Sequence, residues 1–218
     1  MNEKAVACRV LSIIVVDLHS ALLPYISAIM HTLLPLLNTL PFQDIQMAVL
    51  VIMPDLLISI AESIYGLVGI ENYRQSFNFI LDTLLTFLVD DPDLELLIPS
   101  LQTLQLCLEK SVLEKEERVE VIGGAEISRI IDVMNASLKL SFERRAVRSA
   151  DVEQEDWDEE EVEEFKDLEN DENRANYLIS DVIGLLLRLY PRFALPLVHE
   201  IMLSDLMQLA DESRTNGD

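Results

Sequence analysis

The chain has 218 residues, half of them apolar, with only 6 glycines and 8 prolines. This length is enough to bury a substantial core, and apolar residues at nearly every third or fourth position favour long helices over short strands. The formal net charge of −23 excludes a general affinity for nucleic acid or anionic membranes, because binding to phosphates needs clustered lysine and arginine. The sequence therefore predicts an all-α protein whose natural partners are basic.

The first part of the chain has the pattern of paired amphipathic helices. Apolar residues recur at i, i+3, i+4 and i+7, and short breaks with proline, aspartate or glycine separate the segments. The first two pairs are expected at residues 3–18 with 20–37, and at 43–63 with 71–89. Pro54 should kink the third of these helices, because proline removes a backbone hydrogen bond.

The later helix pairs are less regular. The third pair begins after Asp93, and its second helix, over residues 116–144, is expected to break near Gly123. A fourth pair is expected at residues 175–190 and 191–211. The pairs recur about every 40 to 50 residues, which is typical of HEAT repeats. Armadillo repeats or an irregular helical bundle would show the same periodicity.

An acidic segment interrupts this pattern. Residues 151–172 contain 14 aspartates and glutamates and a single lysine, so the segment repels itself and has too few apolar residues to pack. We expect a solvated, largely disordered loop that attracts basic partners, with Trp157 and Phe165 as candidate anchors. Its other candidate binding residues are Asp156, Asp158, Glu159, Glu160, Glu161, Glu163 and Glu164.

The expected organisation is an α-solenoid of about four HEAT-type helix pairs with one acidic insertion. Helical repeats occupy residues 1–149, and the acidic flexible loop occupies 150–173. A further helix pair occupies 174–212, and a disordered tail occupies 213–218.

No catalytic, cofactor-binding or metal-ligating group is predicted. The three histidines lie in different predicted helices, and no glycine-rich loop follows a strand. Cys8 and Cys107 are far apart and are expected in the core of a protein from a reducing compartment. A disordered acidic run cannot hold two carboxylates in a fixed geometry. We therefore expect no enzymatic activity and no cofactor.

Secretion and membrane insertion are also not expected. The N-terminus leads straight into an amphipathic pattern, without the apolar run of a signal peptide. The most apolar stretch, residues 45–61, is interrupted by Gln46, Pro54 and Asp55. It falls short of the roughly 18 to 20 apolar residues that span a bilayer.

A series of segments, in a fixed order, resembles a known family. The segments are EKAVACRVLSIIVVDL, LLPYISAIMHTLLPLL, FQDIQMAVLVIMPDLLISIAES, YRQSFNFILDTLLTFL, and the acidic DWDEEEVEEFKDLENDEN just before YLISDVIGLLLRLYPRFALPLVHEIM. In this order they resemble the C-terminal half of importin-beta (karyopherin-beta) nuclear transport receptors, closest to the importin beta-3 type. The resemblance extends over nearly the whole chain.

The resemblance implies a piece of a long HEAT superhelix. In such receptors the second helices of the pairs line a concave surface that binds cargo proteins and the Ran GTPase. The first helices face outward and meet FG-nucleoporins. The resemblance further implies a location in the cytoplasm, the nucleus and the nuclear pore. The main Ran-binding repeats belong to the N-terminal part of these receptors, so independent transport by this chain is in doubt.

Two further groups of side chains are candidates for function. A polar stripe on the helix predicted at 71–89 would face the concave surface and contact cargo, or would simply be a solvated face. The stripe consists of Glu71, Gln75, Asn78, Asp82 and Thr86. Arg144, Arg145 and Arg148 either pair with the acidic run or complement the C-terminus of their own helix, and the second interpretation is favoured.

The functional hypothesis is a segment of a nuclear import receptor that binds basic cargo proteins carrying localisation signals. Another HEAT scaffold protein is an alternative. A second alternative is an acidic histone or ribosomal-protein chaperone, in which the acidic run alone binds the ligand.

Overall fold

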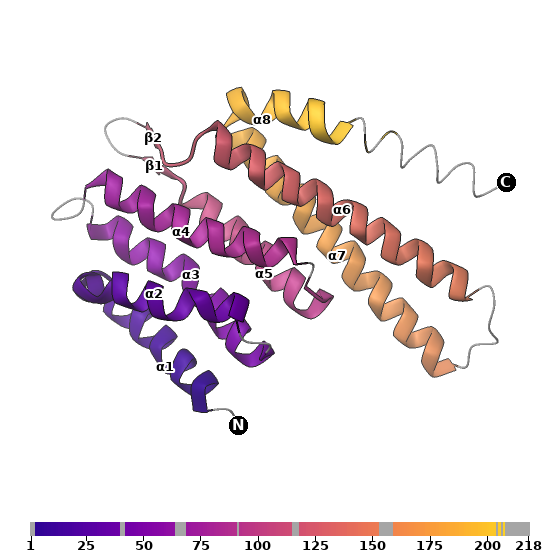
Figure 1. The fold of residues 1–218 in the computed structure, drawn as a ribbon, viewed down its shortest axis with the longest axis horizontal. Coiled ribbons are helices and arrows are strands. Elements are labelled where there is room, and N and C mark those ends of the chain that lie inside the picture. Colours follow the sequence, from indigo (N-terminus) through magenta and orange to yellow (C-terminus); the bar gives the residue numbers. More distant parts are fainter. Residues whose placement is uncertain are drawn as a thin grey trace. The chain divides into compact units, whose positions relative to one another are not determined.

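The computed structural model describes residues 3–39, 42–63, 69–90, 92–114, 118–152 and 159–203, together with Asp205 and Met207. These residues are almost entirely helical, which confirms the predicted all-α class. The chain divides into two compact units, Met1–Ile122 (unit 1) and Gly123–Asp218 (unit 2). Figure 1 shows the helices of both units, labelled in chain order.

Unit 1 is built mainly from five α-helices in its described part. Its elements are α1 (Glu3–Leu18), the 3₁₀ turn η1 (His19–Leu22), α2 (Leu23–Thr39), α3 (Gln43–Ser63), α4 (Ile70–Val89), α5 (Leu94–Glu109), β1 (Val112–Glu114) and β2 (Arg118–Glu120). The helices predicted from Glu3 and Gln43 have their predicted bounds. The helix predicted from Ser20 begins later, at Leu23, with Pro24 in its first turn, where a missing N–H costs little.

The helices of unit 1 form two layers (Figure 1). In one layer α3 packs against both α1 and α5, and in the other α2 packs against α4. The two layers are joined because α3 also contacts α2 and α4, and α4 contacts α5. The odd-numbered helices therefore lie in one layer and the even-numbered helices in the other, with direct packing between α2 and α3, α3 and α4, and α4 and α5.

The core of unit 1 is centred on α3 and α4. Helix α3 has four neighbouring helices, and its Leu56 and Leu57 are fully buried, as are Tyr73 and Phe77 of α4. Burial of side chains of this size contributes about 1.5–3 kcal/mol each. The Tyr73 hydroxyl donates a hydrogen bond of 2.8 Å to the backbone carbonyl of Lys110. This bond ties α4 to the residue that follows α5.

Helix α3 is also long and apolar enough to cross a membrane, the only such helix among the residues that the structure describes. The interruptions at Gln46, Pro54 and Asp55 predicted that its apolar stretch is too short, but over residues 43–62 the helix meets the requirements of length and composition. Within the structure, 67% of that stretch is buried. A core helix that is covered by its neighbours meets the same requirements, so the finding is weak evidence for a membrane span.

A β-hairpin takes the place of the first part of the helix predicted at 116–144. β1 and β2 pair antiparallel with Leu113 opposite Val119, and the N–H of Val121 donates to the carbonyl of Ser111 beside them. The prediction of helix from residue 116 is therefore wrong. Three residues per strand are too few for a periodicity search to separate from the helical pattern around them.

The predicted break near Gly123 is confirmed, because α6 begins at Gly124. The carboxylate of Glu126, in the first turn of α6, accepts a hydrogen bond of 2.9 Å from the backbone N–H of Gly123. The first N–H groups of a helix have no partner within the helix itself, so this side chain stabilises the helix start.

Unit 2 is a group of three helices that all contact one another. They are α6 (Gly124–Val152), α7 (Glu159–Leu189) and α8 (Pro191–Leu197), and a π-helical turn, η2 (Val198–Met202), continues α8. Their core includes Ile130, Ile131 and Met134 from α6 with Val182 and Leu186 from α7. The fourth predicted pair is present in part. Its second helix begins at Pro191 as predicted, but its first begins at Glu159 and not at residue 175.

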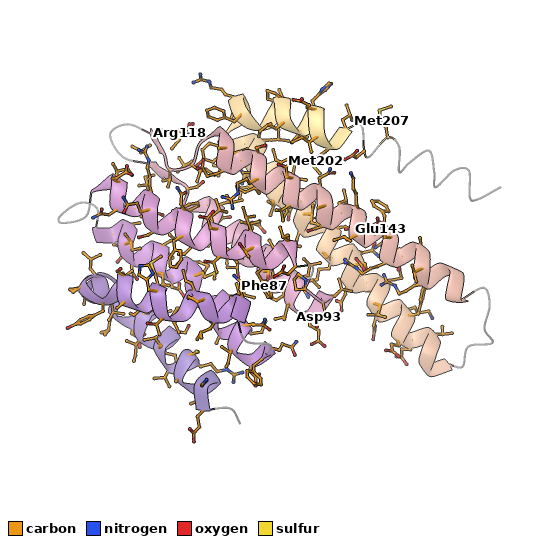
Figure 2. The ribbon with its side chains drawn as sticks, in the orientation of Figure 1. Phe87, Asp93, Arg118, Glu143, Met202 and Met207 are labelled. Carbon is orange, nitrogen blue, oxygen red and sulfur yellow. The ribbon has the colours of Figure 1, made fainter. Side chains whose placement is uncertain are left out.

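Polar contacts hold the residues after η2 against α6. The Asp205 carboxylate accepts a 2.7 Å hydrogen bond from Asn135 and forms a 2.6 Å ion pair with Lys139. Figure 2 labels the buried Met202, the last residue of η2, and the exposed Met207 that follows η2. The predicted tail at 213–218 lies outside the described residues.

Candidate functional site

The polar stripe predicted on the helix at 71–89 lies on α4. Glu71, Gln75, Asp82 and Thr86 are exposed, while Asn78 is half-buried. The Oδ1 atom of Asn78 is buried and accepts no hydrogen bond within the described structure. The stripe is therefore the open face of α4, opposite the face that carries Tyr73 and Phe77 into the core, as expected from the helical period.

A groove runs beside this stripe in the layer of even-numbered helices. Its volume is about 540 Å³, and we name it the α2–α4 groove. Residues of α2, residues of α4 and one residue of α3 line it. They are Leu23, Ile26, Ser27, Met30, His31, Ile60, Asn72, Gln75, Ser76 and Phe79.

The floor and the rim of the α2–α4 groove differ in chemistry. Ile26, Met30 and Ile60 are buried beneath it, whereas Ser27 and Gln75 are exposed at its edge. None of the described lining residues carries a carboxylate or a basic amine. The groove can therefore bury apolar groups on its floor and form neutral hydrogen bonds at its rim.

The two walls of the groove meet through a ring contact. The centroids of the His31 ring on α2 and the Phe79 ring on α4 are 5.0 Å apart, with an angle of 38° between the planes. This is a usual separation for tilted aromatic rings. Of the predicted stripe, Gln75 is the residue that also lines the groove.

The sequence did not point to the α2 wall of this groove. Ile26 and Met30 fit the apolar stripe of α2, so from the sequence they are indistinguishable from ordinary core residues. Their place at the floor depends on how closely α2 approaches α4, which is a tertiary property. His31 gave a possible signal as a polar residue next to that stripe, although a histidine at such a position is common on solvated faces.

The acidic run is helical where the structure describes it. Asp156, Trp157 and Asp158 lie outside the described residues. Glu159, Glu160, Glu161, Glu163, Glu164 and the candidate anchor Phe165 all lie in α7. The expectation of a flexible loop over 150–173 is therefore wrong for the part from Glu159 onward, and also for residues 150–152, which end α6.

The helical period divides the acidic residues of α7 between two environments. Glu163, Glu164 and Asp167 are exposed, and we name them the α7 acidic face. Glu169 is half-buried and Glu172 is fully buried. The prediction of disorder from composition assumes that all of these carboxylates are unpaired and solvated. The carboxylates that are turned toward α6 have partners.

The partners are the three arginines of α6. Arg144 donates to Glu172 at 2.7 Å, and the Ser141 hydroxyl donates to the same carboxylate at 2.6 Å. Arg148 donates to Glu172 at 3.1 Å and to Glu169 at 3.3 Å. The favoured interpretation, in which the arginines complement a helix C-terminus, is therefore wrong, and the alternative of pairing with the acidic run is confirmed.

The third arginine completes this network. Arg145 donates a hydrogen bond of 2.7 Å to the amide oxygen of Asn173 and lies 3.7 Å from a carboxylate oxygen of Glu169. We name the set of these contacts the Arg–Glu network. It joins three positive charges on α6 to two negative charges on α7, so its net charge is small.

The network also changes the acidity of Glu172. Burial by itself would raise the pKa of this carboxyl, but hydrogen bonds from Arg144 and Ser141 and the nearby positive charges outweigh burial and lower the pKa below its ordinary value. Glu172 is therefore ionised at neutral pH and holds α7 against α6 as a buried anion.

The remaining polar groups show no metal or nucleophilic site within the described ranges. No group of three or more histidine, cysteine, aspartate or glutamate side chains is placed to hold a metal ion. Cys8 and Cys107 are buried free thiols, and burial raises the pKa of each. A buried thiol with a raised pKa is a poor nucleophile.

No protein-family description matches the chain, and no solved structure matches it. The resemblance to importin-beta receptors therefore stays a prediction from the sequence, and the function has to be argued from the groove, the α7 acidic face and the charge of the chain.

Proposed function

We propose that this chain is a HEAT-type segment of an importin-beta-type nuclear import receptor, and that its α2–α4 groove binds basic cargo proteins. The observation that carries the proposal is the position of Gln75, where the predicted cargo stripe and the groove meet. The groove lies in the layer of second helices, which the resemblance assigns to the concave surface.

The packing of unit 1 supports the repeat assignment. Each helix of the odd-numbered layer packs against the next odd-numbered helix, and α2 packs against α4 in the same way. Two layers of this kind bury a continuous core while one layer remains available for binding, as in helical solenoids.

The charges along α4 support a basic ligand. Glu71 and Asp82 are exposed four residues before and seven residues after Gln75, so the helical period brings all three to one face. At a rise of 1.5 Å per residue, the two carboxylates stand roughly 16 Å apart along the helix. A lysine-rich segment in the groove would meet a carboxylate toward each end, and the net charge of −23 would speed its approach.

The rest of the receptor function belongs to a longer protein. Ran GTPase and FG-nucleoporins would bind other repeats of the same superhelix, and the receptor would move between cytoplasm and nucleus through the nuclear pore. This chain would contribute a cargo surface that works by binding alone, with no chemical step and no cofactor.

The proposal is tested by the affinity of the full chain for a fluorescent lysine-rich localisation peptide, measured at low and at physiological ionic strength. A peptide with glutamine in place of lysine is the ligand control. The double variant Glu71→Lys/Asp82→Lys should lose at least about tenfold in affinity, equivalent to about 1.4 kcal/mol. Unchanged affinity in this variant would refute binding along the groove.

A second candidate function, the acidic chaperone, is favoured by one observation. The α7 acidic face is exposed on a helix, so its three carboxylates form a fixed array and not a diffuse tail. The variant Glu163→Gln/Glu164→Gln/Asp167→Gln tests it with the same peptide. Binding that disappears in this variant and survives in the α4 variant supports the chaperone. Deleting residues 151–172 would be a poorer test, since the deletion also removes the buried Glu172.

A further inference from the structure

The walls of the α2–α4 groove are parallel helices. The rings of His31 and Phe79 meet across it, with 5.0 Å between their centroids. Further along both helices, Nδ2 of Asn38 donates a hydrogen bond of 3.3 Å to the carbonyl oxygen of Thr83, so the two helices run in the same direction. The lining residues of α4 extend from Asn72 to Phe79, which is roughly 10 Å along the helix. Both walls and the floor belong to α2, α3 and α4, so no further segment is needed to form the groove.

The inside of the groove favours an apolar occupant. The lining residues named above include no carboxylate, so a lysine ammonium placed inside would lose water without gaining a counter-charge. A large apolar side chain would instead cover the floor and gain free energy from leaving water. It would contact Ile26, Met30 and Ile60 beneath it, and the half-buried Leu23 and Phe79 at the two ends. The lining therefore selects against the lysines of a basic segment, although the chain as a whole attracts them.

Carboxylates stand just outside both ends of the groove. Glu71 directly precedes Asn72, the first lining residue of α4, and Asp82 follows Phe79 by three residues. Glu71 lies 3.8 Å from Arg74 in an exposed ion pair, and such a pair is weak enough to exchange for another cation. Along the groove the order is therefore negative, uncharged, negative. A ligand with the complementary order is positive, apolar, positive.

We propose that the cargo segment binds with one large apolar side chain inserted in the α2–α4 groove, and with lysines on both sides of it that stay outside the groove. This inference rests on the proposed function and adds the feature that distinguishes a ligand from other basic segments. Glu71 and Asp82 stand roughly 16 Å apart along the helix. An extended chain rises about 3.3 Å per residue, so the two lysines lie about five residues apart with the apolar anchor between them.

The two parts of such a ligand respond differently to salt. Ions screen the attraction between exposed lysines and carboxylates, whereas the burial of the anchor does not depend on charge. Raising the ionic strength should therefore weaken the binding of every basic segment. The advantage of a segment with an anchor over one without it should stay the same, at least about tenfold in affinity.

The test is fluorescence anisotropy of the full chain with three labelled peptides. In the first, one serine separates a central leucine from a pair of lysines on each side. In an extended chain its inner lysines are about 13 Å apart and its outer lysines about 20 Å apart, which brackets the separation of the carboxylates. The second peptide has serine in place of leucine, and the third has the leucine moved to one end. Both should bind at least about tenfold more weakly than the first at low and at physiological ionic strength.

A variant of the chain tests where the leucine binds. Ser76 is half-buried in the α4 wall, so Ser76→Glu places a carboxylate inside the groove. This variant should prefer a peptide with lysine at the central position, whereas the wild type prefers leucine there. Thr32→Glu is the matched control, since it adds the same charge at an exposed position of α2 outside the lining and should keep the preference of the wild type. Circular dichroism verifies the helices, and Ser27→Glu on the opposite wall replaces Ser76→Glu if that variant loses helix.

The outcomes separate this inference from the proposed function. Equal affinity for the leucine and serine peptides, lost when glutamine replaces the lysines, overturns the apolar anchor and leaves the binding of basic cargo intact. Leucine-dependent binding that persists without the lysines refutes the proposed function and keeps the anchor. A Ser76→Glu variant that still prefers leucine overturns the groove as the place where the anchor binds. Binding of none of the peptides overturns both proposals.

Discussion

The interface between α3 and α4 and the interface between the outer parts of α6 and α7 join helices by different means. The buried side chains of α3 and α4 are mostly apolar, and leucine and isoleucine are the most frequent among them. Between Arg144 and Arg148 on α6 and Glu169 and Glu172 on α7, the contacts are ion pairs and hydrogen bonds. Both arrangements stabilise helix pairs, but apolar burial depends on area, whereas the ionic network depends on geometry and on protonation.

The difference shows what each region tolerates. Apolar packing survives changes of pH and salt, and it loses stability in proportion to the volume removed. A buried ion pair gains little over an apolar pair of the same size, because both charges must leave water. Removing one partner is costly, however, since the other charge remains buried without compensation. The α6–α7 contact is therefore the region where a single substitution or a change of pH acts most specifically.

The largest expected effect comes from the apolar interface. Phe77→Ala should lower the free energy of unfolding by about 4 kcal/mol, because it removes a fully buried ring and leaves a cavity. Urea unfolding measures the change, and hydrogen exchange should assign it to unit 1. Thr86→Ala, at an exposed position of the same helix, should change stability by less than about 0.5 kcal/mol. A comparable loss in both variants would contradict the assignment of Phe77 to the core.

The ionic interface should be nearly as sensitive to the loss of one group. Glu172→Ala should cost about 3 kcal/mol, because Arg144 and Arg148 would remain partly buried without their shared anion. Hydrogen exchange should locate this loss in α6 and α7. Glu163→Ala, on the exposed α7 acidic face, is the control and should be nearly neutral.

A triple replacement sharpens the comparison between the two interfaces. Glu172→Leu combined with Arg144→Met and Arg148→Met should recover much of the stability that Glu172→Ala loses, since no uncompensated charge would remain. If the triple variant were less stable than Glu172→Ala, the attraction within the network would stabilise the folded state by more than the desolvation of its charges costs.

Acid should remove a smaller part of the same stabilisation. The pKa of Glu172 is lowered in the folded state, so its contribution is complete above the unfolded value of about 4.3. The contribution is lost as pH falls through the lower folded value. Protonation leaves the side chain in place with some of its hydrogen bonds, so the loss should be less than in Glu172→Ala. The stability difference between wild type and Glu172→Gln should therefore shrink as pH falls below about 4. A difference that stays constant would contradict an ionised Glu172.

The same contrast explains which elements the sequence predicts correctly. The bounds of α3 follow from its sequence because its apolar residues keep the helical period for 21 residues and charged residues are few. The start of α7 at Glu159 cannot be predicted from the sequence, because the run from Glu159 to Glu172 has the composition of a disordered segment. Its stabilising arginines lie about twenty to thirty residues earlier, and pairing across that separation depends on how α6 and α7 fold back on each other.

The candidate site shows a similar division. The exposed positions of Gln75 and Asp82 follow from the period of one helix. The groove depends on three helices, so Ile26, Met30 and Ile60 looked like ordinary core residues. Helical periodicity predicts which way a side chain points. It does not predict whether a neighbouring helix covers that side chain. That property depends on side-chain volumes across the layer of even-numbered helices.

The smallest effect tests a polar contact between α4 and the residue that follows α5. Tyr73→Phe removes the hydroxyl that donates to the carbonyl of Lys110 and keeps the buried ring, so it should cost about 1 kcal/mol. Tyr25→Phe is the matched control, because the Tyr25 side chain is exposed and water replaces what its hydroxyl loses. If Tyr73→Phe were neutral, this hydrogen bond would add nothing to the apolar burial that holds α4, and the contrast with α6–α7 would be sharper. A loss near that of Phe77→Ala would instead mean that one hydrogen bond fixes the residues after α5, and that directional contacts matter in both interfaces.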